Sequence, residues 1–122
     1  MLKVNFLHIC DTALVDTNGK LSIIGIFENI NSNNFPAKHP QMAIVIGFES
    51  DKSETYGIEI SFLDEKDEIL KVQTNVKIGS NRKGTLIQQM VLYEIPRDLT
   101  QKIKVNFEGN TIHTDYITIN GK

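Results

Sequence analysis

Cys10 and the histidines are the residues whose types could do chemistry. Cys10 is the only cysteine, and His8 lies two residues before it. On a regular strand these two side chains share a face about 6–7 Å apart, too far for a direct thiol–imidazole bond without a bulge. His39 could act as the base that forms a thiolate if its segment folded over Cys10. One hypothesis is therefore an enzyme or redox sensor using Cys10 with His39, and Asp11 as a neighbouring acid.

The same residues have a simpler interpretation. A free cysteine is most often a small buried hydrophobic residue, and a carboxylate such as that of Asp11 commonly accepts backbone N–H bonds that fix a turn. His8, Cys10, His39 and His113 lack the paired ligands at short intervals that structural zinc sites use. The sequence therefore predicts no metal, no cofactor and no catalytic set.

The bulk composition narrows the class of protein. The chain has 122 residues, which predicts one domain over residues 1–122. Its net charge of −2 argues against a nucleic-acid partner. No apolar run approaches the ~18 residues of a membrane span, and the first residues do not have the pattern of a signal peptide. A single cysteine allows no intrachain disulfide, which favours a reducing compartment. We therefore expect a cytoplasmic protein with no membrane partner.

The elements that would position these side chains centre on a hairpin. Asn18-Gly19 between two apolar runs predicts a two-residue type I′ turn, with Thr17 opposite Lys20. The second strand, residues 21–27, is apolar on both faces, so we expect a central strand covered on both sides. Gly25 within it would weaken the strand unless it marks a bulge, a bend or a close approach.

The remainder of the chain alternates with the period of strands. No amphipathic helical period persists for three turns, and turn signals recur at intervals of about 8–12 residues. The strands expected after the hairpin cover residues 42–48, 56–62, 70–78, 85–95, 103–107 and 112–119. Residues 42–48 are apolar on both faces, whereas residues 56–62 and 103–107 alternate apolar side chains on one face with mostly polar ones on the other. The prediction is an all-β, two-layer antiparallel β-sandwich of immunoglobulin-like or related topology, with seven to nine strands.

A long loop is predicted from Asn29 to Pro40. It holds four asparagines, a serine and two of the three prolines, and long loops in compact domains are often functional. Its candidate binding residues are Asn31, Asn33, Asn34, Phe35, Lys38 and His39.

Three stretches together carry a resemblance. They are Ile9-Cys10-Asp11, the Gly19–Phe27 run, and Phe35-Pro36-Ala37-Lys38-His39-Pro40. The chain resembles a family of small bacterial proteins known only as an uncharacterised domain. The match covers about the first third of the chain, and Glu108-Gly109 stands where that family has Asp-Gly. The resemblance implies a β-sandwich and implies no activity.

The leading functional hypothesis is a non-catalytic protein-interaction or binding module. It would act through the loop described above, or through an exposed edge strand that pairs with a partner chain. Self-association into a homodimer by the same edge is part of this hypothesis. The alternatives are the Cys10–His39 enzyme or redox sensor, and a structural component of a larger assembly.

Overall fold

The computed structural model describes residues 1–32, 37–64, 67–95 and 99–121, and the side chains of residues 1–31, 41–64, 70–90 and 100–119. The described residues form nine strands and no helix. The strands are β1 (Lys3–Val15), β2 (Leu21–Ile26), β3 (Asn29–Ser32), β4 (Ala37–Glu49), β5 (Thr55–Asp64), β6 (Asp67–Lys77), β7 (Lys83–Ile95), β8 (Leu99–Phe107) and β9 (Asn110–Gly121). In this part of the chain, no helix could cross a membrane.

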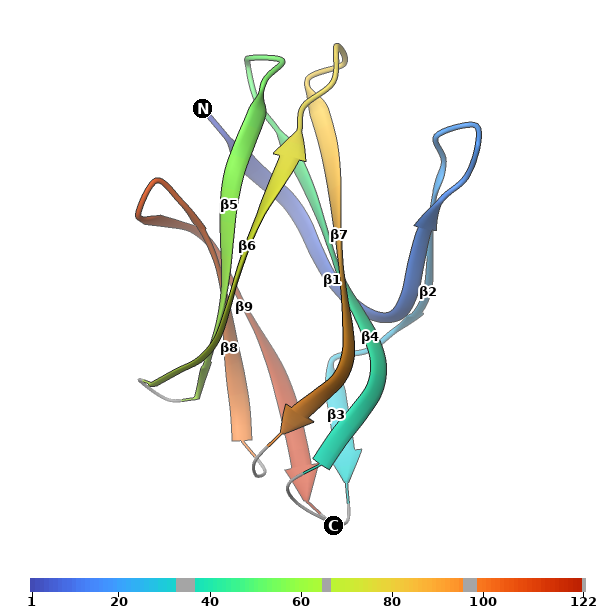
Figure 1. Cartoon of the computed structure of the whole chain (residues 1–122), viewed down its shortest axis with the longest axis vertical. Coiled ribbons are helices and arrows are strands. Elements are labelled where there is room, and N and C mark those ends of the chain that lie inside the picture. The colour runs from blue at the N-terminus through green and yellow to red at the C-terminus, as the bar shows by residue number, and fades with distance from the viewer. Residues whose placement is uncertain (33–36, 65–66, 96–98, 122) are drawn as a thin grey trace.

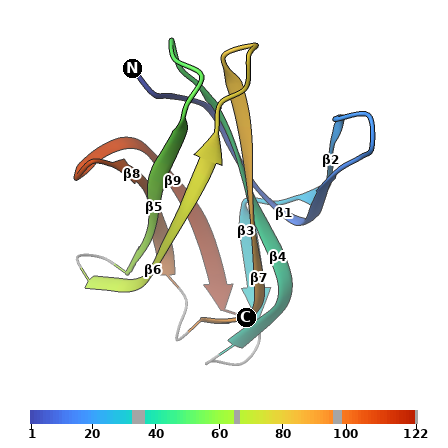
Figure 2. The ribbon, with the colours of Figure 1, turned by 45° about the horizontal axis from the view of Figure 1, so that its top comes forward.

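The strands form two sheets that pack face to face (Figures 1 and 2). One sheet has four strands in the order β2-β1-β4-β7, and the other has five in the order β3-β9-β8-β5-β6. When β2 and β3 are set aside, β1-β4-β7 face β9-β8-β5-β6, which is an immunoglobulin-like arrangement. The predicted all-β sandwich is confirmed. Its described strands pair antiparallel except at β3, which follows β2 of the first sheet along the chain and pairs parallel with β9 of the second.

The main core lies between the sheets, where inward side chains alternate with outward polar ones. On β5, Ile58, Ile60 and Phe62 are at most 3% exposed, and on β8, Ile103 and Val105 are fully buried. Removing such side chains from water is the largest favourable term in folding. β4 is buried on both faces between Met42 and Phe48, as its sequence predicts.

The outer face of β4 is covered by the arm, defined here as residues 11–26. β1 pairs with β4 only from Lys3 to Cys10, and its remainder pairs only with β2. Figure 1 shows this hairpin bending away from the sandwich beside β4. The base of the arm still packs on the sheet, in a small second core. That core contains Cys10 and Ala13 of β1, Ala43 and Val45 of β4, and the partly buried Phe6, Leu21, Ile23 and Ile87.

The turn of the arm differs from the predicted two-residue loop. The Gly19 N–H donates to Asp16 O at 3.0 Å, and the Asp16 N–H donates to Lys20 O at 2.9 Å. Asp16 Oδ1 accepts the N–H groups of Asn18 and Lys20 at 2.8 and 2.9 Å. These bonds hold a three-residue loop that closes with Gly19 at a φ of 81°. The predicted pairing is wrong by one residue, and Val15 lies opposite Leu21.

Two further predictions need correction. β2 is an edge strand and is not covered on both sides, because only β1 pairs with it and Ile24 is 56% exposed. The predicted loop from Asn29 to Pro40 is wrong at both ends, because Asn29–Ser32 pairs with β9 and β4 already begins at Ala37. Residues 33–36 lie outside the described part of the chain.

Candidate interaction surface

The arm carries four of the six large hydrophobic residues that are exposed among the described side chains. Leu14, Val15, Ile24 and Ile26 are 47%, 52%, 56% and 55% exposed. Among the large hydrophobic residues described, only Met1 and Tyr116 are comparably exposed. Single apolar residues on a surface are ordinary, whereas several on one hairpin mark a candidate interaction site. These four residues are called the arm patch below; Leu14 and Ile24 lie on one face of the hairpin and Val15 on the other.

The alternation of the hairpin explains why this surface faces outward. Ala13 and Ile23 form a cross-strand pair, and both pack against the outer face of β4. Side chains next to them along a strand point the opposite way, so Leu14 and Ile24 point to solvent. Both faces of the arm are therefore apolar, but their surroundings differ. One face covers the sheet, and nothing among the described residues covers the other.

The outer edge of β2 is open to a further strand. The Asp16 N–H donates to Lys20 O, so Asp16 and Lys20 are a hydrogen-bonded pair of the ladder. In an antiparallel ladder, hydrogen-bonded pairs alternate with non-hydrogen-bonded pairs. The N–H and C=O groups of Leu21 and Ile23 therefore point to the free side. Natural edge strands are usually guarded by lysine, proline or inward charges, but Leu21–Ile26 has no charged residue and no proline.

Gly25 lies against the Asp11 side chain. Its φ is 72°, and a Cβ added there would overlap the Asp11 carboxylate. Glycine tolerates both conditions because it has no Cβ. The predicted close approach at Gly25 is therefore confirmed, and the exposed Asp11 side chain lies over the backbone of β2.

Cys10 has the environment of a structural cysteine. Its side chain is fully buried, and its Sγ donates to Ala43 O at 3.6 Å. Burial raises the pKa of the Cys10 thiol, and the negative charge of Asp11 raises it further. A buried thiol with a raised pKa forms little thiolate at neutral pH. Cys10 lies opposite Ala43, which is four residues along β4 from His39, or about 13 Å on an extended strand.

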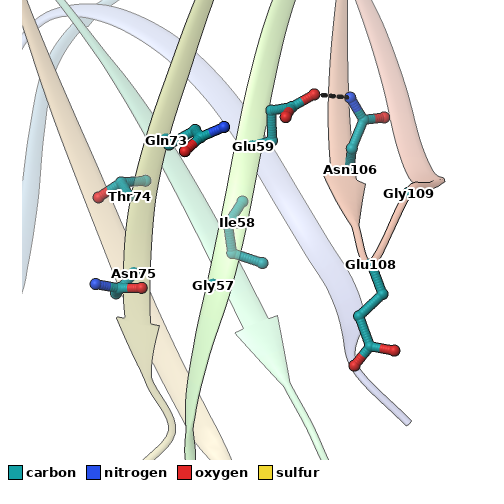
Figure 3. Close-up of a pocket in the computed structure, with 9 residues that line it drawn as sticks. All are labelled: Gly57, Ile58, Glu59, Gln73, Thr74, Asn75, Asn106, Glu108 and Gly109. Atoms are coloured by element: carbon teal, nitrogen blue, oxygen red, sulfur yellow. Dashed lines mark hydrogen bonds between the residues drawn. The ribbon is translucent and has the colours of Figure 1, made fainter.

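A polar hollow of about 430 Å³ lies on the outer face of the second sheet (Figure 3). Gly57, Glu59, Asn106 and Glu108 are among its lining residues. Asn106 donates to Glu59 Oε1 at 3.3 Å and accepts from Thr111 at 2.8 Å. The Asn106 amide thus both donates and accepts hydrogen bonds on this face of the sheet. Glu108 has a φ of 51°, in a left-handed turn with Gly109.

The sequence model of a family of unknown function, DUF6941, matches residues 5–119. The chain belongs to the DUF6941 family. This confirms the predicted membership of an uncharacterised family, and the family description assigns no activity. No curated protein matches the chain.

Solved structures share the fold of this DUF6941 chain. A β-glucosidase from Listeria innocua in complex with isofagomine aligns with 99% of the chain at a TM-score of 0.57 and 10% identity. The same organism's β-glucosidase in complex with glucose aligns with 99% of the chain at a TM-score of 0.53 and 9% identity. In both, the chain spans only 16% of the length of the β-glucosidase. At such low identity the likeness shows the fold alone.

The DUF6941 structure places the other predicted site residues in several settings. Asn31 is exposed on β3. Lys38 and His39 lie on β4, where their backbones pair with Glu94 and Tyr93, and their side chains are outside the described set. Asn33, Asn34 and Phe35 lie outside the described residues.

The other two histidines each lie beside a neighbouring side chain. His8 stacks on Phe6 with ring centroids 5.3 Å apart, and His113 Nε2 lies 3.7 Å from Asp115 Oδ2. Within the described ranges, no group of three or more potential metal ligands converges.

The arm patch is the feature that sequence reasoning missed. Its signal was present as a strand with apolar residues on both faces, but that signal was assigned to burial. The absence of any charge from residues 21–26 was the additional observation that distinguishes an unguarded edge.

Proposed function

We propose that this DUF6941 chain is a non-catalytic protein-interaction module that binds its partner through the arm. The observation that carries the proposal is the concentration of half-exposed aliphatic side chains in the arm patch, from Leu14 to Ile26. A folded chain gains nothing by leaving such side chains in water, and their burial against a partner is favourable.

The proposed mode of binding is the addition of a strand to β2. The free N–H and C=O groups of Leu21 and Ile23 would provide main-chain hydrogen bonds. Ile24 and Ile26 would provide apolar contacts on one face of the added strand. Recognition by strand addition divides in this way between backbone affinity and side-chain specificity.

The proposed compartment is the cytoplasm. The only cysteine, Cys10, is free and buried, so the fold makes no use of an oxidising environment. The burial of Cys10 gives no support to the alternative, an enzyme or redox sensor, because the raised pKa of the Cys10 thiol opposes thiolate formation. Membership of a larger assembly is a further form of the same arm-mediated binding.

The test compares capture of partners by two variants. The wild type, the arm variant Ile24→Lys/Ile26→Lys and the control Gln73→Lys/Asn75→Lys serve as baits in the native host. Gln73 and Asn75 are exposed positions on β6, so the control adds the same charge to the other sheet. Any captured protein, including a tagged second copy of this chain, is then purified and its Kd is measured with each bait.

The proposal predicts that the arm variant raises the Kd at least about tenfold, because a charge enters an apolar contact. The control should bind like the wild type. Equal binding by all three baits, or a wild type that captures neither another protein nor its own tagged copy, contradicts the proposal.

A further inference from the structure

We propose that the occupant of the arm is a second copy of this chain. In this arrangement two β2 strands pair antiparallel across a two-fold axis at Ser22, which sets Leu21 of one copy opposite Ile23 of the other and joins two four-stranded sheets into one. The inference rests on the proposed function and names the partner of the same surface.

The edge of β2 is complementary to itself. The outward N–H and C=O groups of Leu21 and Ile23 include both donors and acceptors, and an antiparallel copy presents the same groups in reverse order. Closed two-fold pairing uses one surface twice and leaves no free end for further growth. It would also cover β2, an edge strand of the first sheet that has no charged residue.

The charge next to β2 favours the antiparallel orientation. Lys20 precedes the strand and is exposed. With an axis at Ser22, Lys20 of one copy lies opposite Ile24 of the other. A parallel pairing in register would place lysine beside lysine, which is unfavourable.

The apolar surface continues beyond the arm. Ile26 and Tyr116 line one small hollow together with Phe27 and Glu28, and Tyr116 of β9 is 54% exposed. Each copy therefore offers the arm patch and one aromatic ring. Six-residue strands with these side chains make an interface below the roughly 1,200 Å² of stable complexes. We therefore expect a reversible dimer with a Kd in the micromolar range or weaker.

The first test is sedimentation equilibrium of the full chain over concentrations from about 5 µM to about 1 mM, a range that brackets the weak affinity expected from an interface of this size. The wild type should shift from monomer towards dimer. Ile24→Lys should raise the dimer Kd at least about tenfold, and the control Gln73→Lys on β6 should leave it unchanged. Because Ile24 is exposed, its variant should keep the wild-type far-UV spectrum and melting temperature.

The second test uses a cross-link. Ser22 is exposed, and an axis at Ser22 sets its side chain opposite its own copy, so Ser22→Cys should form a disulfide-linked dimer under oxidising conditions. A Ser22→Cys variant that cross-links no faster than the exposed control Gln73→Cys contradicts the two-fold arrangement.

A wild type that remains monomeric at about 1 mM, far above a micromolar Kd, overturns the dimer inference. The interaction module then depends on the capture experiment alone, where an arm-dependent foreign partner would still support it. A dimer that Ile24→Lys leaves intact overturns the inference by placing the contact elsewhere.

Discussion

β2 and β6 each end one of the two sheets, and their surfaces are opposite in character. β6 exposes Lys71, Gln73, Asn75 and Lys77, while Val76 between them is 2% exposed. Lys71 also lies 3.8 Å from Glu59 on the neighbouring strand. β2 exposes Ile24 and Ile26 and has no charge. Lysine on an exposed edge opposes pairing with other chains, so β6 has the surface of a closed edge and β2 that of an open one.

The comparison teaches that the apolar content of a strand and its burial are separate properties. A smaller share of β6 is apolar, and its Leu70, Val72 and Val76 pack in or against the core. A larger share of β2 is apolar, but the sandwich covers only one of its faces. The exposed apolar side chains of β2 are explained if a partner covers the other face.

The largest expected effect is a difference in the free energy of unfolding between variants of a core isoleucine next to β6 and of an exposed isoleucine on β2. Ile78 follows β6 and is 1% exposed, whereas Ile24 is 56% exposed. Ile78→Ala should lower the free energy of unfolding by about 2–5 kcal/mol, because it removes buried contacts and leaves a cavity. Ile24→Ala should change it by no more than about 0.5 kcal/mol when the protein is monomeric. Urea denaturation at low concentration measures both, and equal losses would contradict the assigned burial.

A smaller effect is expected from two glycines of the arm. Gly25→Ala should cost more than the roughly 1–2 kcal/mol of a left-handed residue, because its Cβ also overlaps the Asp11 carboxylate. Gly19→Ala is the matched control, since its φ is also positive but its Cβ would meet no atom within 4 Å. In an Asp11→Ala background the difference between the two glycines should shrink. Thermal unfolding of the four variants tests this, and identical costs would place the Asp11 side chain elsewhere.

The next prediction concerns pH at the base of the arm. The pKa of the Cys10 thiol is raised above 9.0 by burial and then by Asp11. The folded state therefore holds the thiol proton more tightly than the unfolded state. This contribution to stability is complete below the ordinary thiol pKa and is lost as pH rises through the raised one. The difference in unfolding free energy between the wild type and Cys10→Ala should thus be constant near neutral pH and fall in alkaline solution.

The same environment predicts slow chemistry. At neutral pH, a thiol reagent should modify native Cys10 much more slowly than the unfolded chain, because little thiolate forms and the side chain is buried. Modification as fast as in the unfolded chain would show an accessible thiolate and would revive the Cys10 enzyme hypothesis.

The smallest expected change in stability comes from closing the edge of β2. Ser22 is exposed on that strand, and Ser22→Lys gives it the residue that guards β6. The free energy of unfolding should change by no more than about 0.5 kcal/mol, while self-association should weaken. Unchanged association, measured beside Gln73→Lys, would mean that the edge is not used.

The sequence predicted much of the fold, because alternation with period two is a local property. It located β6 and the core residues of β5 and β8, where one face is polar and the other packs inward. It also identified β4 as covered on both faces between Met42 and Phe48, which the structure confirms. These predictions needed no knowledge of which strands are neighbours.

The errors arise where neighbours decide the outcome. Periodicity shows that both faces of β2 are apolar, but it does not reveal which face a sheet covers. β3 is a short asparagine-rich segment whose strand structure depends on pairing with β9, which is distant in sequence. At the hairpin, the Asp16 side chain captures the Asn18 and Lys20 amides and selects a three-residue loop over the type I′ turn. The candidate surface was therefore unpredictable until the sheet order was known.

Amide hydrogen exchange as a function of protein concentration tests the central claim most directly. If β2 is an open edge that pairs with a second copy, the N–H groups of Leu21 and Ile23 should become more protected as concentration rises. The exposed edge of β6 should exchange at the same rate throughout. Exchange from β2 that is independent of concentration, or protection that increases equally on both strands, would contradict it.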